Sequence, residues 1–133
     1  MNFRTLHVLI AGILTAFICS CKTGPELKVA YFQADATPPV GSPVAYVVAR
    51  SITDSLSARG IVLTGAGAPV VMATVDWITL SNEGLEFFSE KLAQAAGTTP
   101  DRVTIHVLHQ HDAPRCDFST EKLMEEHGLG GTR

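Results

Sequence analysis

Two histidines separated by one residue are the side chains in this sequence best suited to chemistry. His109 and His111 follow an apolar run, Arg102–Leu108 (RVTIHVL), that has the composition of a β-strand. Side chains of a strand alternate between two faces, so strand geometry continued through these positions would place both imidazoles on one face. Neutral imidazoles are common ligands of zinc and iron, and the pair therefore predicts half of a metal site. The alternative is a loop with two incidental histidines.

Two carboxylates could support such a site. Asp112 directly follows the pair and could be a ligand, or an acceptor that fixes the tautomer of an imidazole. Asp76 ends a second apolar strand, Val70–Val75 (VVMATV), and is expected in the same pocket, although an aspartate that only begins a turn has the same pattern. His106 lies an odd number of residues before both histidines of the pair, so in a strand we expect it on the other face, as a packing or surface histidine.

A zinc hydrolase needs three or four protein ligands and one open position, which two histidines do not supply. Cys116 would complete a His-x-His-x₄-Cys set, but a buried, unreactive cysteine is the more common situation. Further candidates follow Phe118 on an expected helix: Glu121, Glu125, Glu126 and His127. A solvent-facing helix surface is their more ordinary interpretation. We therefore expect no complete catalytic set within this sequence.

Apolar runs and turn residues indicate the elements that position these side chains. Leu27–Gln33 (LKVAYFQ) predicts a first strand. Gly60–Leu63 and Pro69–Val75 predict a hairpin, because Gly65 and Gly67 between them supply the positive φ that a turn needs. The nearly continuous apolar character of the second hairpin strand is expected of a strand that is covered on both faces.

The segment between the first strand and the hairpin is less regular. Ala34–Pro43 (ADATPPVGSP) contains three prolines and a glycine, so it is expected to be a loop. Val44–Ser57 suits either a short helix or a second strand.

A helix is expected between the two strands that carry the candidate residues. Ser81 or Asn82 can be its N-cap, and Gly97 its C-terminal stop. Its apolar face is formed by residues at helical spacing: Leu85, Phe88, Leu92 and Ala95 or Ala96. A strand, a helix and a strand within about forty residues form a βαβ unit with parallel strands and a right-handed crossover. We therefore predict an α/β fold with a mixed sheet, in which a β-hairpin is followed by a βαβ unit, and a ligand site at the carboxyl ends of the parallel strands.

The first twenty residues have the pattern of a bacterial export signal. Arg4 gives a small positive region, and Leu6–Ile18 is largely apolar. As a helix this run would be about 20 Å long, too short for a bilayer core of about 30 Å. It ends in ICSC, which resembles a lipobox, so we expect cleavage before Cys21 and lipidation of that cysteine, whose two or three acyl chains would anchor the protein to a membrane. Ordinary secretion with a coincidental cysteine pair is the alternative.

The sequence thus divides into a signal (1–20), a tether (21–26) and one domain (27–133). Its 133 residues are 46% hydrophobic and 17% charged, which indicates a globular domain and not a disordered chain. Ten Lys and Arg against thirteen Asp and Glu give a net charge of −3 without a basic cluster, which excludes nucleic-acid binding. Since Cys19 leaves with the signal and Cys21 carries lipid, Cys116 is left without a disulfide partner in the mature chain.

The order of these features resembles the N-terminal part of the neutral/alkaline non-lysosomal ceramidase family. The resemblance covers about Lys28–Phe118, most of the mature chain. Its matching parts are the first strand running into ADATPP, Arg59 opening a strand, the strand ending in Val75-Asp76, the helix, and the apolar strand ending in HQHDAP (109–114). In that family the last part reads His-Thr-His-Ser-Gly-Pro, and its two histidines bind the catalytic zinc.

The resemblance implies that His109 and His111 are the first two zinc ligands. Asp112 and Ala113 stand where the family has Ser and Gly, so the backbone after the ligands is expected to differ. Family members are several hundred residues long and take a third His, a Glu and a Tyr from downstream segments. The resemblance therefore implies that this sequence is the N-terminal fragment of a longer zinc-dependent hydrolase.

The activity that the resemblance implies is hydrolysis of the amide of N-acylsphingosine or a related amide, in lipid metabolism. Zinc lowers the pKa of a water molecule to about 7 and polarises the amide carbonyl. The alternative is a non-catalytic, membrane-anchored binding or accessory lipoprotein that keeps the fold. In both cases we expect an exported bacterial lipoprotein of the cell envelope, held to the membrane by its N-terminal lipid.

Overall fold

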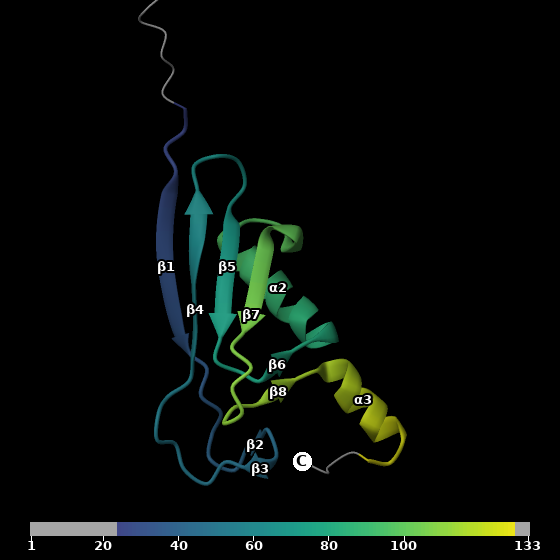
Figure 1. The fold of residues 1–133 in the computed structure, drawn as a ribbon. Helices are drawn as coiled ribbons and strands as arrows, with labels where there is room; N and C mark the ends of the chain where they lie inside the picture. Colours follow the sequence, from purple (N-terminus) through teal and green to yellow (C-terminus); the bar gives the residue numbers. More distant parts are fainter. Residues whose placement is uncertain (1–23, 130–133) are drawn as a thin grey trace, which may run out of the picture.

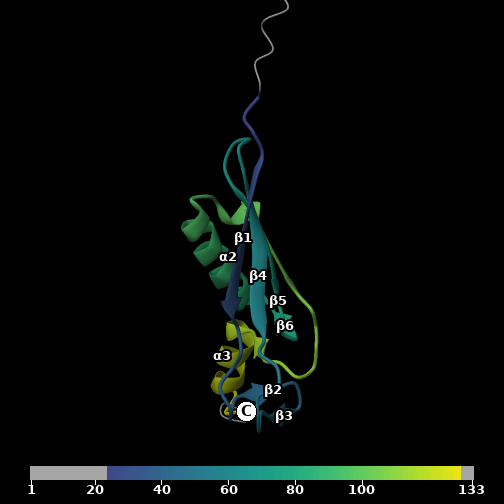
Figure 2. The ribbon, with the colours of Figure 1, turned by 90° about the vertical axis from the view of Figure 1, so that its left-hand side faces the viewer.

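The computed structural model describes residues 24–129, so the expected signal and the lipidation site Cys21 lie outside the described residues. Within 24–129, a four-stranded mixed sheet is covered on one side by helix, as Figures 1 and 2 show. The predicted α/β class, with a hairpin followed by a βαβ unit, is confirmed. None of the helices in this range is long and apolar enough to cross a membrane. The elements are β1 (Lys28–Asp35), β2 (Pro43–Val44), β3 (Val47–Val48), β4 (Ser57–Thr64), β5 (Val70–Val75), β6 (Thr79–Leu80), α2 (Asn82–Ala96), η1 (Pro100–Arg102), β7 (Val103–Val107), β8 (Arg115–Cys116) and α3 (Phe118–Glu126).

The strand order of the main sheet is β1-β4-β5-β7. β4 is antiparallel to both β1 and β5, whereas β5 and β7 are parallel and are joined through α2. β1, β5 and β7 consequently run in the same direction. The chain enters β1 at one end of the sheet and leaves β5 and β7 at the other end (Figure 1).

The core lies between the sheet and α2. Val71 and Ala73 of β5 are 1% and 6% exposed, and Ala93 of α2 is 2% exposed. Phe32 of β1 lies over Gly60 of β4 on this face, where a Cβ on the glycine would approach the phenyl ring to 2.6 Å. Glycine is therefore required at that point of the core.

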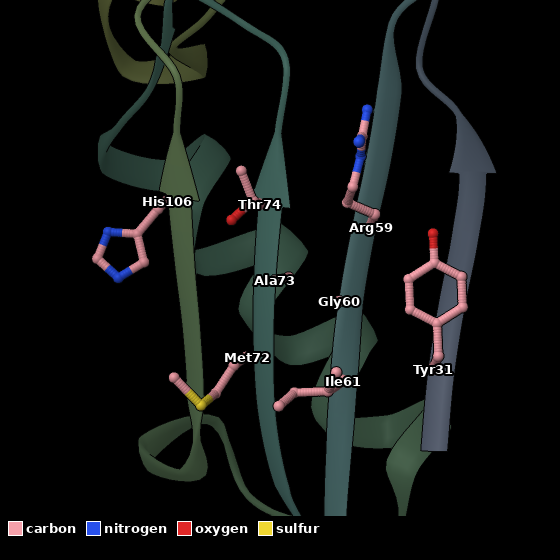
Figure 3. Close-up of a pocket in the computed structure, with 8 residues that line it drawn as sticks. All are labelled: Tyr31, Arg59, Gly60, Ile61, Met72, Ala73, Thr74 and His106. Atoms are coloured by element: carbon pink, nitrogen blue, oxygen red, sulfur yellow. The ribbon is translucent and has the colours of Figure 1, made fainter. Parts of the chain in front are cut away.

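The opposite face of the sheet is open within the described residues. Met72, between the buried Val71 and Ala73, is 44% exposed, and in Figure 3 its side chain lies on the face turned away from α2. The expectation that β5 is covered on both faces is therefore wrong for this range. An apolar strand fits the pleated surface of a sheet whether or not a second layer covers it, so composition alone did not distinguish the two cases.

The irregular segment before β4 resolves into short strands. β1 continues through Ala34 and Asp35, which pair with Ala58 and Ser57, so the loop begins two residues later than expected. Neither a helix nor a single strand occupies Val44–Ser57. Instead, β2 and β3 form a small antiparallel pair, and the last residue of the range already belongs to β4.

α2 has the predicted start and end. Ser81 is the N-cap residue, although its hydroxyl donates to Asp117 at 3.1 Å and accepts no hydrogen bond from the helix backbone. Gly97 ends the helix in the left-handed conformation, with φ of 66°. Of the two alanines left open by the periodicity, Ala96 is half-buried and Ala95 is exposed, so Ala96 belongs to the packed face.

Candidate metal centre

The histidine loop leaves the sheet beside the segment that follows β5. The ends of the two parallel strands are in register, Val75 with Val107. Beyond them, the N–H of Leu108 donates to the carbonyl of Val75 at 3.1 Å, and the N–H of His109 donates to the carbonyl of Trp77 at 3.1 Å. These bonds extend the parallel pairing past the strand ends and hold the loop at the expected edge of the sheet.

The two histidines meet through a bend in the loop and not through strand geometry. β7 ends at Val107, and His109 has a φ of 57°, in the left-handed region. The period-two argument for the pair is therefore wrong, since strand geometry does not extend through His109 and His111. Their rings nevertheless contact edge to face, with centroids 5.3 Å apart.

One imidazole is already oriented as a metal ligand would be. Nδ1 of His109 lies 2.8 Å from the carbonyl oxygen of Ile78. A carbonyl can only accept, so the neutral ring carries its proton on Nδ1 and leaves the lone pair of Nε2 available. Metal-ligating histidines are commonly held in this way. The donor chemistry of the pair thus fits two of the ligands of a zinc ion.

The side chains of 24–129 contain no group of three or more His, Cys, Asp or Glu that could hold a metal ion. Asp76, one of the two predicted supporting carboxylates, is engaged elsewhere. Its Oδ2 accepts from the N–H and the hydroxyl of Ser57, both at 2.8 Å, and pairs with Arg59 at 3.3 Å. Burial raises the pKa of Asp76, but the Ser57 hydrogen bonds and the Arg59 charge outweigh this and hold the pKa below its usual value.

Gln110, which the sequence analysis did not single out, connects the two segments at this edge. Its amide nitrogen donates to the main-chain carbonyl of Asp76 at 2.8 Å, and its amide oxygen accepts from the N–H of Asp112 at 2.8 Å. Asp112 itself is exposed. Asp76 therefore touches the histidine loop through its backbone, and Asp112 lies on that loop beside the histidine pair.

Tyr46 and Arg115 were also missed by the sequence analysis. The turn between β2 and β3 is attached to the loop by a hydrogen bond from Ala45 to the carbonyl of Ala113 at 3.0 Å. The rings of Tyr46 and His111 are nearly perpendicular, with centroids 5.7 Å apart, and the Arg115 guanidinium carbon lies over the Tyr46 ring, 5.5 Å from its centroid. Both contacts join residues far apart in the sequence. The only sign of them near Tyr46 in the sequence is a tyrosine in a loop.

The remaining candidate ligands lie outside the pair. Cys116 is half-buried in β8 against Gly84 of α2, and burial, followed by the charge of Asp117, raises the pKa of its thiol. His127 follows α3, with Nδ1 2.9 Å from the carbonyl of Leu123. Neither residue belongs to a potential metal-binding group in the described part of the chain. The other three helix candidates, Glu121, Glu125 and Glu126, lie on α3 itself.

A shallow hollow of about 260 Å³ lies on the open face of the sheet and not at the strand ends (Figure 3). Tyr31, Ile61 and Met72 form its apolar part. His106, which faces Thr74 across β5 and β7, lines its edge and is exposed, as a surface histidine. The hollow does not include the histidine pair.

Comparison with protein-family models, with curated proteins and with solved structures finds no match for this chain. A metal-centre interpretation therefore depends on the geometry around His109 and His111, together with the resemblance in the sequence.

Proposed function

We propose that this chain is the N-terminal part of a zinc-dependent amide hydrolase of the neutral ceramidase type. The observation that carries the proposal is the 2.8 Å contact between Nδ1 of His109 and the carbonyl of Ile78, beside the ring of His111. It gives one imidazole a fixed tautomer and a free Nε2 at the edge where the parallel strands end.

Each neighbouring residue would have a positioning task. Ile78 holds the ring of His109, Tyr46 contacts the ring of His111, and Gln110 ties the loop to the end of β5. Zinc, when bound, would supply Lewis acidity towards an amide carbonyl and acidify water. Two imidazoles bind the ion weakly, so the remaining ligands would come from outside the described residues.

The substrate class is an amide, either an amide lipid or a small soluble amide. Lipidation of Cys21 would place the protein on a membrane of the bacterial cell envelope, within reach of amide lipids. The second candidate is a membrane-anchored binding or accessory lipoprotein without catalysis. In its favour, residues 24–129 contain no group of three or more side chains that could hold a metal ion.

Zinc binding tests the proposal directly. Purified chain, titrated with zinc, is expected to bind the ion weakly, because two imidazoles are only part of a ligand set, and His109→Ala and His111→Ala are each expected to abolish this binding. His106→Ala and His127→Ala are the matched controls, because both remove a histidine that lies outside the pair. Zinc binding that is equal to that of the wild type in all four variants would disprove the assignment. Further coding sequence that supplies a third His, a Glu and a Tyr would favour the hydrolase over the accessory lipoprotein.

A further inference from the structure

We infer that Arg115 and Tyr46 form an anion-binding wall beside the histidine pair, so that the site selects amides that carry a carboxylate close to the amide group. The amide part of this inference rests on the proposed function. The carboxylate part rests only on the contacts of Arg115 and Tyr46, and it can be tested without metal.

Backbone hydrogen bonds hold the main chain of Arg115 close to the segment that orients the pair. It belongs to β8, whose partner in the two-stranded ladder is β6, with Arg115 opposite Thr79. Thr79 directly follows Ile78, and the N–H of Ile78 donates to the carbonyl of Pro114 at 3.1 Å. Ile78 is also the residue that orients His109. The same two-stranded ladder therefore fixes one imidazole and the backbone that carries the guanidinium.

The charge of Arg115 is not used within the described part of the chain. Arg59 is paired with Asp76, and Arg102 donates to the carbonyls of Ala68 and Pro69. Arg115, by contrast, is exposed and makes neither an ion pair nor a side-chain hydrogen bond with residues 24–129. Its five N–H donors remain for a ligand, and their planar fork matches the two oxygens of a carboxylate.

Tyr46 connects this cation to the histidines. The tyrosine is 77% exposed, yet its ring contacts both His111 and Arg115. The Tyr46 ring therefore connects the guanidinium of Arg115 to the imidazole of His111. This span suits a small molecule whose amide lies at the histidines and whose carboxylate reaches Arg115 a few bonds away. An N-acyl amino acid has this chemistry, whereas an uncharged amide leaves the guanidinium without a partner.

The test compares two ligands that differ only in charge. Full-length chain in detergent, with a chelator to keep it metal-free, is titrated with N-acetylglycine and with N-acetylglycinamide, and the ring signals of His111 and Tyr46 are followed by NMR. We expect saturable binding of the carboxylate with a dissociation constant on the order of millimolar. The uncharged amide should bind about fivefold more weakly, as expected for one exposed charge pair.

Variants locate the contact. Arg115→Gln should lower carboxylate binding to the level of the uncharged amide, and Tyr46→Ala should weaken it, while Tyr46→Phe keeps the ring and retains it. Lys91→Gln is the matched control, because Lys91 forms a similar cation–ring contact with Phe87, at 5.4 Å, on α2. Equal binding of the two ligands, or unchanged carboxylate binding in a folded Arg115→Gln variant, would overturn the inference. The titration is then repeated with zinc, which tests the proposed function separately. A chain that does not bind zinc would contradict the proposed function but would not change the result obtained without metal.

Discussion

Ser57 and Asp76 are joined by two hydrogen bonds to one carboxylate oxygen, from the N–H and from the hydroxyl of Ser57, both at 2.8 Å. Ser57 is 6% exposed, and its hydroxyl also accepts from Arg59 at 2.8 Å. The bonds connect the first residue of β4 to the residue after β5, at the edge of the sheet where the histidine loop begins. They therefore support the site through the strand ends, without contacting the histidines.

Replacing Asp76 should destabilise the fold. Asp76→Ala leaves the buried N–H of Ser57 without its acceptor, and an unsatisfied buried donor costs about 1–3 kcal/mol. The free energy of unfolding, measured by chemical denaturation, is the readout. Asp112→Ala removes an exposed carboxylate and should change stability by less than about 0.5 kcal/mol. An Asp76→Ala variant as stable as the wild type would contradict the role assigned to this hydrogen-bonded cluster.

Stability should fall in acid. The pKa of Asp76 is lowered for the reasons given above, and the pKa of Asp117 is lowered mainly by the hydrogen bond from the backbone N–H of Thr120. A carboxyl whose pKa is lower in the folded state adds stability above its unfolded value of about 3.9, and this contribution is lost as the pH falls through the folded pKa. Melting temperatures between pH 7 and pH 2 should therefore drop below about pH 4. Asp76→Asn should flatten that decrease, and an equally steep profile would count against the assignment.

Adding one methyl group to Gly60 should strain the core. A Cβ at this position would lie 2.3 Å from the carbonyl oxygen of Met72 and 2.6 Å from the ring of Phe32. The backbone oxygen cannot move away freely, so Gly60→Ala should cost about 1–3 kcal/mol or more in unfolding free energy. Gly24→Ala, where nothing lies within 4 Å, is the control and should be nearly neutral. Similar unfolding free energies for the two variants would show that the close approach is not present in solution.

The lipid anchor can be checked by mass spectrometry of the protein made in a bacterial host. Wild-type chain should begin at Cys21 and carry an acylated N-terminus, because the ICSC sequence resembles a lipobox. Cys21→Ser should prevent acylation and leave the protein unprocessed. Cys19→Ser is the matched control, since that cysteine would be removed with the signal. A mature wild-type protein without lipid would favour ordinary secretion.

Much of the fold was predictable because it is encoded in local patterns. Three features predicted three strands and the helix to within a few residues: the β-branched and aromatic residues of β1, the glycines between β4 and β5, and the spacing of apolar residues between Ser81 and Gly97. What the patterns did not show depends on contacts between distant segments. The open face next to Met72 is one example, because it is decided by what packs on the sheet and not by the strand itself.

The candidate site was likewise only partly predictable from the sequence. The position of the histidine pair at the end of β7 followed from the strand pattern, but the left-handed backbone of His109 did not. The orienting carbonyl of Ile78 and the ring of Tyr46 come from segments 31 and 65 residues away from their histidine partners. A single sequence contains no local signal for such partners.

The chain enters the sheet at the end opposite the histidine loop, so the length of the sheet separates the start of β1 from the candidate site (Figure 1). β1 contains eight residues, which at about 3.3 Å each extend about 26 Å from the entry to the edge of the candidate site. A molecule anchored through its N-terminus and standing upright would hold the histidines well above the lipid headgroups and expose them to soluble substrates. The same molecule lying flat would bring them to the headgroup layer. Tilt relative to the membrane would then decide which amides the site meets.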